Sequence, residues 1–102
     1  MDRIEYFSAL VESDPDEPRA RYGLAVALRQ AGRHADAIEQ YRAYLGMAED
    51  EGAAYGHLAE CLAATGDVSG AADAYLAGID AALRNGYNGL AADYEAAIEA
   101  LS

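Results

Sequence analysis

Two segments decide the fold: residues 55–75 read YGHLAECLAATGDVSGAADAY, and residues 21–41 read RYGLAVALRQAGRHADAIEQY. At a spacing of 34 residues, Leu, Ala, Leu, Gly, Ala and Tyr recur in the same order in both segments. The register also extends backwards, because Ile4, Phe7 and Val11 lie 34 residues before large apolar residues. A fixed period of this length indicates a helical repeat array, in which each unit buries its apolar face against its neighbours.

Within each unit the apolar residues recur at a spacing of three or four, which is typical of helices. Gly32 and Gly66 are expected to end the first helix of each pair, Asp2 and Asp67 to be N-caps, and Pro18 to lie in a first turn. No stretch has the alternating pattern of a strand. The sequence therefore predicts helices over residues 3–12, 18–31, 34–47, 52–65, 68–84 and 87–101.

The last predicted helix departs from the period. Residues 87–94 match residues 55–62 best at a spacing of 32, and no further helical pattern follows to pair with them. This helix is expected to serve as the terminal cap that a repeat array needs. The resulting prediction is a single domain over residues 1–102, with a half repeat at 1–17, repeats at 18–51 and 52–85, and a capping helix at 86–102.

Composition alone would favour disorder, because Leu, Ile, Val and Phe make up only 18 of the 102 residues and the formal net charge is −11. The repeat reverses this interpretation. The chain has 25 alanines, and short side chains at helix crossings let the two axes approach closely. We expect Ala25, Ala37, Ala59 and Ala71 to hold such positions.

The charge also disfavours several classes of function. Eighteen carboxylates stand against seven arginines and no lysine, so binding to nucleic acid or to an anionic membrane is not expected. No apolar run approaches the roughly 20 residues that span a bilayer. Residues 1–5, MDRIE, lack the layout of a signal peptide, so we expect a cytoplasmic protein. The single cysteine, Cys61, excludes an internal disulfide and a thiolate zinc cage, and no cofactor is expected.

The repeat columns resemble the tetratricopeptide repeat family, as in a small bacterial or archaeal protein or domain. One copy consists of Tyr55, Leu58, Ala59, Leu62, Gly66, Ala71 and Tyr75. The other consists of Arg21, Leu24, Ala25, Leu28, Gly32, Ala37 and Tyr41, with Arg21 where the family has an aromatic residue. Tyr44 and Gly78 replace the usual alanine late in the second helix, so the packing there is expected to change locally.

This resemblance implies an all-α fold, a right-handed α-α superhelix (solenoid) of antiparallel helix pairs with about six helices. In that family the first helices line a concave groove that binds a peptide or a helix of a partner protein. Carried over by column, the groove residues are Arg19, Tyr22, Val26, Arg29, Gln30, Ala53, His57, Glu60, Ala64, Asn88 and Glu95. Arg19, Tyr22 and Arg29 would form a basic corner suited to a carboxylate, which arginine binds through two hydrogen bonds.

Other residues are assigned to structure rather than to chemistry. His57 and Glu60 could offer two metal ligands, but the repeat has no second histidine near them, so no metal site is expected. His34 is expected in a solvent-exposed linker and Cys61 in the core. The tyrosines of the aromatic columns are also expected in the core: Tyr41, Tyr55, Tyr75 and Tyr87. The sequence has neither a phosphate loop nor a recognisable Ser-His-Asp arrangement, so no catalytic residue and no enzyme activity are expected.

Two functions from different classes remain. The first is a non-catalytic protein–protein interaction module, a scaffold or adaptor that binds its partner in the groove. The alternative is structural self-assembly into a homo-oligomer through the terminal helices. In the first of these helices, the apolar residues available for burial against another chain are Ile4, Phe7, Leu10 and Val11. The chain could also be a segment of a longer repeat protein, and an acidic exterior without lysine would suit a high-salt cytoplasm.

Overall fold

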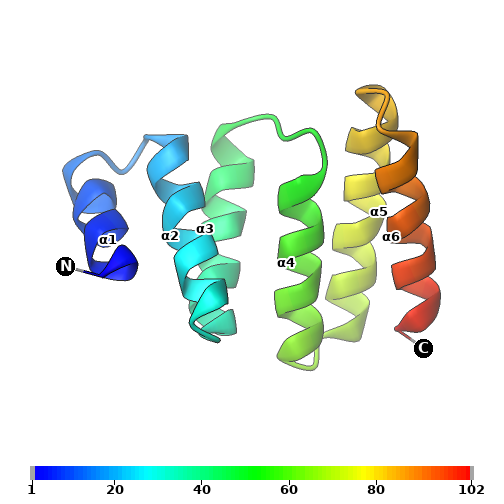
Figure 1. The fold of residues 1–102 in the computed structure, drawn as a ribbon, viewed down its shortest axis with the longest axis horizontal. Helices are drawn as coiled ribbons and strands as arrows, with labels where there is room; N and C mark the ends of the chain where they lie inside the picture. Colours follow the sequence, from blue (N-terminus) through cyan, green and yellow to red (C-terminus); the bar gives the residue numbers. More distant parts are fainter. Residues whose placement is uncertain (1, 102) are drawn as a thin grey trace. The chain divides into compact units, whose positions relative to one another are not determined.

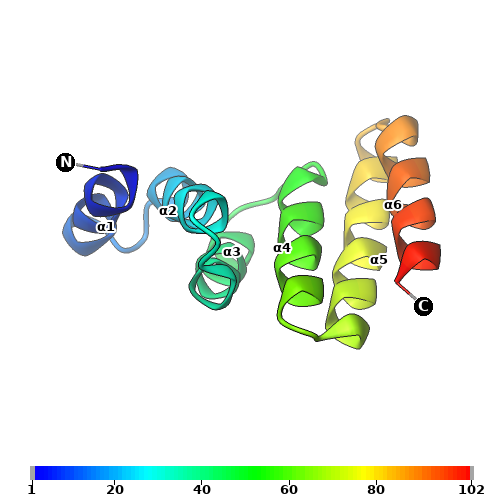
Figure 2. The same cartoon turned by 60° about the horizontal axis from the view of Figure 1, so that its bottom comes forward.

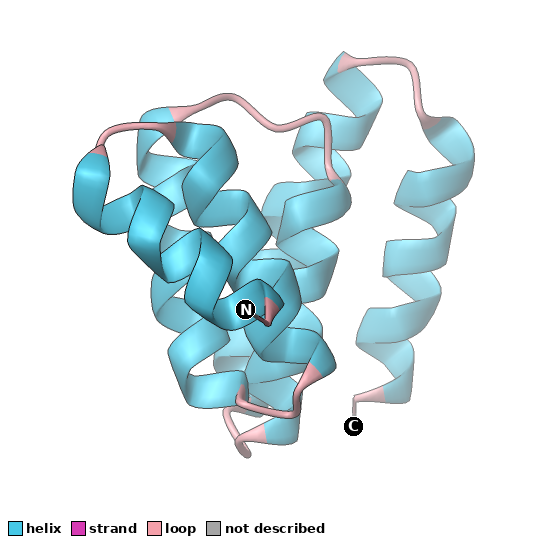
Figure 3. Cartoon of the chain, turned by 60° about the vertical axis from the view of Figure 1, so that its left-hand side comes forward, coloured by secondary structure: helices cyan, strands magenta, loops and turns pink. Residues whose placement is uncertain are grey.

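The computed structural model describes residues 2–101, which fold into six α-helices (Figure 1). They are α1 (Arg3–Ser13), α2 (Pro18–Gln30), α3 (His34–Met47), α4 (Ala53–Ala64), α5 (Val68–Arg84) and α6 (Asn88–Ala100). The six predicted helices are confirmed, each end within one residue. Within residues 2–101 only helices and connecting loops are present (Figure 3). None of these helices combines the length and the apolar character needed to cross a membrane.

The helices form two compact units, Met1–Ala48 with α1 to α3 and Glu49–Ser102 with α4 to α6. In the first unit α1 packs on α2, and α2 packs on α3. In the second unit α4 packs on α5, and α5 packs on α6. Figures 1 and 2 both show α4, α5 and α6 side by side, joined by tight turns that reverse the chain. Antiparallel packing of successive helices follows from connections this short.

Three helices end at a glycine with the same hydrogen-bond pattern. After α2, the Gly32 N–H donates to the Arg29 carbonyl at 3.0 Å, and the next N–H donates to the Leu28 carbonyl at 2.9 Å. This pattern requires a positive φ, which is 78° at Gly32, and glycine adopts it without strain. Gly66 ends α4 in the same way, as predicted, and Gly86 does so after α5.

The predicted helix starts are also confirmed. The Asp2 carboxylate accepts a hydrogen bond from the Glu5 N–H at 2.8 Å, and the Asp67 carboxylate accepts one from the Gly70 N–H at 2.8 Å. Pro18 is the first residue of α2. Each carboxylate accepts a hydrogen bond from an N–H that has no partner within the helix, and a proline in the first turn has no N–H that needs one.

Small residues fill the helix crossings as expected. Ala25, Ala37, Ala59 and Ala71 are all 0% exposed, and Cys61 is likewise fully buried. The larger core side chains in the two units are Leu24, Leu28, Ile38, Tyr41, Leu58, Leu62, Tyr75 and Tyr94. The alanine-rich composition is therefore a packing feature of a folded chain.

Three of the residue assignments differ from the structure. Tyr55 was expected in the core but is only half-buried, and the assignments of Tyr87 and His34 are wrong. Tyr87 was expected in the core but is 47% exposed, because it precedes α6 as the N-cap residue. Tyr94, one turn and a half into the same helix, is buried instead at 8% exposure. His34 was expected in an exposed linker, yet it begins α3, is half-buried, and its Nδ1 is buried with no hydrogen-bond partner among the described residues.

The residues at the two departures from the repeat columns each have an aromatic neighbour. The Tyr44 ring lies edge-on to the Tyr22 ring, with centroids 5.0 Å apart. Gly78 makes room for Tyr94: a Cβ placed on this glycine would lie 2.8 Å from the Tyr94 ring and 2.9 Å from the Tyr55 Cβ. Because Gly78 has no side chain, the Tyr94 ring can lie close to the backbone of α5 at this position.

Candidate binding groove

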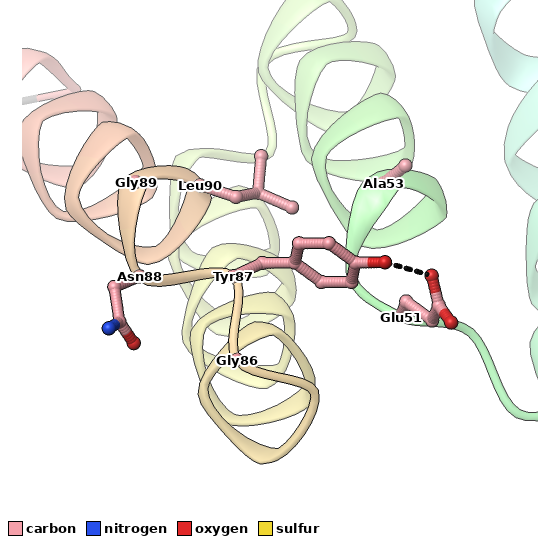
Figure 4. A pocket seen from close by; sticks show the side chains of 7 residues that line it. All are labelled: Glu51, Ala53, Gly86, Tyr87, Asn88, Gly89 and Leu90. Carbon is pink, nitrogen blue, oxygen red and sulfur yellow. Dashed lines mark hydrogen bonds between the residues drawn. The ribbon is translucent and has the colours of Figure 1, made fainter.

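Two adjoining hollows lie between α4 and α6 in the second unit. The larger hollow, about 520 Å³, is lined by Glu51, Ala53, Gly86, Tyr87, Asn88, Gly89 and Leu90 (Figure 4). The smaller hollow, about 240 Å³, is lined by Ala53, Gly56, His57, Glu60, Leu90 and Tyr94. Because the two hollows share Ala53 and Leu90, they form one surface, called here the α4–α6 groove.

Tyr94 forms a fixed wall of the smaller hollow. Its hydroxyl donates a hydrogen bond to the Gly52 carbonyl at 2.8 Å, and its ring packs against Tyr75 with centroids 5.3 Å apart. The ring also fills the space that a side chain at Gly56 would occupy. Burial raises the pKa of Tyr94 from 10 to about 12, so the hydroxyl stays protonated above the pH at which an exposed tyrosine ionises.

The loop before α4 forms the rim of the larger hollow. The Asp50 carboxylate accepts hydrogen bonds from the N–H groups of Gly52 and Ala54, both at 2.9 Å. The Tyr87 hydroxyl donates to Oε2 of Glu51 at 2.9 Å, so the side chain reaches from the head of α6 to this loop (Figure 4). That hydrogen bond, followed by the charge of Glu51, raises the pKa of Tyr87. Tyr87 and Tyr94 together tie the loop to α6.

The net charge is concentrated in the unit that carries the groove. Glu49–Ser102 contains ten carboxylates and one arginine, a formal charge of −9, whereas Met1–Ala48 contains eight carboxylates and six arginines, a formal charge of −2. Glu51 lines the larger hollow and Glu60 the smaller one, and no arginine lines either of them. The groove therefore has an apolar lining between negative charges.

Four of the residues assigned to the groove by repeat column lie together here: Ala53, His57, Glu60 and Asn88. Glu95 is exposed on α6 and Ala64 is exposed at the end of α4, and neither lines these hollows. His57 and Glu60 do not belong to any group of three or more possible metal ligands among residues 2–101.

The remaining predicted groove residues belong to the first unit. The Arg19 side chain is 96% exposed, with Nε 3.6 Å from Oε1 of Glu17. Arg29 and Tyr22 both contact Tyr41: the Arg29 Nε donates to its hydroxyl at 3.2 Å, and the Tyr22 ring lies edge-on to it at 6.1 Å. The other two lie on α2 as well: Val26, half-buried, and Gln30, whose Oε1 accepts from the Arg3 guanidinium at 2.7 Å.

The helix proposed for self-association is partly covered within its own unit. The Phe7 ring lies against Gly23 of α2, in the space that a side chain there would need. Ile4 and Val11 are half-buried, whereas Leu10 is 38% exposed. Ile4 also lines an open hollow of about 410 Å³ between α1 and α2, together with Asp2, Arg3, Ala27, Gln30 and Ala31.

The sequence did not identify Glu51, Tyr87, Leu90 and Tyr94 as lining residues. Tyr87 had been assigned to the core, and Glu51 falls in a connection that the repeat columns do not cover. A signal for Tyr94 was present in the sequence: at the spacing of 32 it aligns with Leu62, a large apolar column. That alignment places a large side chain in the core of the second unit.

Comparison with known proteins agrees with this fold. A family model described as tetratricopeptide repeat matches residues 4–52. No curated protein matches the sequence significantly. Among solved structures, PcrH of Pseudomonas aeruginosa in complex with the chaperone binding region of PopD is 27% identical, with a TM-score of 0.87 over 96% of this chain and 74% of that chain. A type III secretion complex from Aeromonas hydrophila is also 27% identical, with a TM-score of 0.87 over 96% and 66%.

A third similar structure is the type III secretion chaperone SycD of Yersinia enterocolitica in complex with a peptide of the translocator YopD. It is 24% identical, with a TM-score of 0.84 over 96% of this chain and 76% of that chain. At this identity the likeness shows the fold alone. The expected all-α repeat fold is thus confirmed: residues 4–52 match the tetratricopeptide repeat family, and the chain has the fold of these secretion chaperones.

Proposed function

We propose that this chain is a non-catalytic interaction module that binds a segment of a partner protein in the α4–α6 groove. The observation that carries this proposal is the pair of adjoining hollows, whose apolar walls lie beside polar groups. An open surface of this kind suits an extended or helical segment, which can bury alternate side chains and leave the others in water. Solved structures with this fold include chaperones in complex with a partner's binding region or peptide.

The rigidity of the groove also favours binding. Tyr87 and Tyr94 hold the loop before α4 through hydrogen bonds at 2.9 and 2.8 Å. A surface that is already ordered loses little conformational entropy when a ligand binds. The residues assigned by repeat column on α2 are a separate proposal, a contact surface of the first unit alone: Arg19, Tyr22, Val26, Arg29 and Gln30. We further propose that the module works in the cytoplasm.

The proposal can be tested by selecting phage-displayed random 12-residue peptides on the purified chain. Ala53 is exposed and lines both hollows, so Ala53→Trp should fill the groove without disturbing the core. Ala77 is exposed on α5 and lines neither hollow, so Ala77→Trp is the matched control. Peptides should be enriched on the wild type and on Ala77→Trp and be lost on Ala53→Trp. Equal enrichment on all three proteins, or none on any, would overturn the proposal.

Self-assembly is the second candidate function, and exposed apolar side chains favour it. On α1, Tyr6 is 52% and Leu10 is 38% exposed; on α5, Leu76 is 56% and Leu83 is 54% exposed. Exposed apolar side chains that lie about one or two turns apart on the same helix, as each of these pairs does, can contribute to an association site. Light scattering after size exclusion at tens of micromolar decides between the candidates. A mass of two or more chains supports self-assembly, whereas a monomer mass eliminates it.

A further inference from the structure

We infer that the occupant of the α4–α6 groove is a basic segment of a partner protein, in which an arginine side chain binds beside Glu51 and Tyr87 and a neighbouring aliphatic side chain enters the smaller hollow. This inference rests on the proposed function and adds the chemistry of the partner.

The larger hollow has the groups that recognise a guanidinium. One oxygen of the Glu51 carboxylate accepts from the Tyr87 hydroxyl at 2.9 Å, and a carboxylate can accept about four hydrogen bonds in all, which leaves capacity for a donor pair. Tyr87 is 47% exposed, and its ring lies between Leu90 and Glu51 (Figure 4). An arginine stem can pack on Leu90 while its planar head stacks on the ring and bonds to the carboxylate.

The smaller hollow accepts an apolar side chain next to that arginine. Its walls include the methyl group of Ala53, the backbone of Gly56, the Leu90 side chain and the Tyr94 ring. The Tyr94 hydroxyl is already committed to the Gly52 carbonyl at 2.8 Å, so the ring offers its apolar surface. Burying an aliphatic group there is favourable by the hydrophobic effect. Shared walls at Ala53 and Leu90 require the two partner side chains to be close in sequence.

The charge of the second unit determines the sign of the partner. With a formal charge of −9 on Glu49–Ser102 and Glu60 at the smaller hollow, an acidic segment is repelled from the groove and a basic one is attracted. This attraction should weaken with salt, because mobile ions screen exposed charges. The carboxylate recognition suggested by Arg19 and Arg29 belongs to the first unit and does not bear on this groove.

The test uses the peptide most strongly enriched in the phage selection, synthesised with a fluorescent label and again with each arginine replaced by citrulline, which keeps the shape and removes the charge. Binding is measured by fluorescence anisotropy to wild type, Glu51→Gln and the control Glu12→Gln, which changes an exposed glutamate of α1. We expect Glu51→Gln to raise the Kd of the arginine peptide about 5- to 10-fold, as for a charge-assisted hydrogen-bonded pair. Citrulline should have the same effect on wild type and little effect on Glu51→Gln.

The outcomes separate the two proposals. Groove-dependent peptides that contain arginine within three residues of Leu, Ile or Met, with the coupling described, support the inference. Groove-dependent peptides without arginine, or an arginine effect that Glu51→Gln leaves unchanged, overturn the inference and leave the proposed function standing. Absence of any peptide lost on Ala53→Trp overturns both. Circular dichroism of Glu51→Gln confirms that a lost interaction is not lost helix.

Discussion

The substitution Gly78→Ala tests whether the buried face of α5 is shaped to hold the Tyr94 ring. A Cβ placed on Gly78 would lie 2.8 Å from Cε2 of Tyr94 and 2.9 Å from Cβ of Tyr55. The Tyr55 atom is fixed to the backbone of α4. The Tyr94 ring is held by its hydrogen bond to Gly52 at 2.8 Å, so neither neighbour can move away easily. The added methyl group must therefore displace a helix or the tyrosine.

Two opposing effects determine the size of the change. Replacing glycine by alanine within a helix stabilises the folded state by about 1 kcal/mol. Overpacking a well-filled core costs about 1–3 kcal/mol. Because both contacts are shorter than ordinary van der Waals distances, we expect the cost to exceed the gain by about 1 kcal/mol. For a domain of this size, that difference lowers the Tm by about 4–8 °C.

Thermal and urea unfolding followed by circular dichroism at 222 nm measure this difference. Gly89→Ala is the control in the same unit, since Gly89 is exposed on α6 and a Cβ there meets no atom within 4 Å. That variant should be as stable as the wild type or more stable. If Gly78→Ala also raises the Tm, the packing of Tyr94 against α5 described above is wrong.

Other perturbations test separate parts of the structure. Tyr94→Phe should lower the stability by about 1–3 kcal/mol, because the buried Gly52 carbonyl loses its donor; chemical denaturation measures this. Burial raises the pKa of Tyr94 from 10 to about 12, so the folded state favours the neutral hydroxyl. The contribution of this hydroxyl to stability should be complete below pH 10 and be lost as the pH rises towards 12. Unfolding midpoints measured over this pH range should therefore fall less steeply in Tyr94→Phe than in the wild type. Asp50→Ala removes the acceptor of the Gly52 and Ala54 N–H groups and should cost about 1 kcal/mol, with unchanged stability contradicting the capping role. Arg29→Glu tests the basic corner of the first unit: calorimetry with an acidic peptide should show weaker binding, because arginine binds carboxylates, and an unchanged Kd would overturn this assignment.

The sequence was informative wherever the structure depends on local rules. Helix ends follow from single residues, such as Gly32, whose positive φ closes α2, and Asp67, whose carboxylate caps α5. The crossing alanines follow from the 34-residue register, because a position that repeats in every unit has the same surroundings in each. These features need no knowledge of contacts distant in the chain.

The roles of Tyr87 and Tyr94 required the three-dimensional structure. The alignment at a spacing of 32 placed Tyr87 in an aromatic column, but the shortened connection leaves it before the first turn of α6. Tyr94 is held by Gly52, 42 residues away, and Tyr87 by Glu51, 36 residues away. The repeat pattern cannot reveal such pairs, because they occur once and are not related by the period. The negative charge of the second unit can be counted from the sequence. Its consequence for the choice of partner follows only once the structure shows that the groove lies in that unit.

The central claim, that the α4–α6 groove is where the partner binds, is tested most directly by a ¹⁵N–¹H NMR titration of the labelled chain with a selected peptide. Binding in the groove predicts the largest amide shifts in residues 50–60 and 87–94, with little change at Leu76 and Leu83 on the exposed face of α5. Shifts concentrated on α5 or α1, with the groove amides unchanged, would contradict the account.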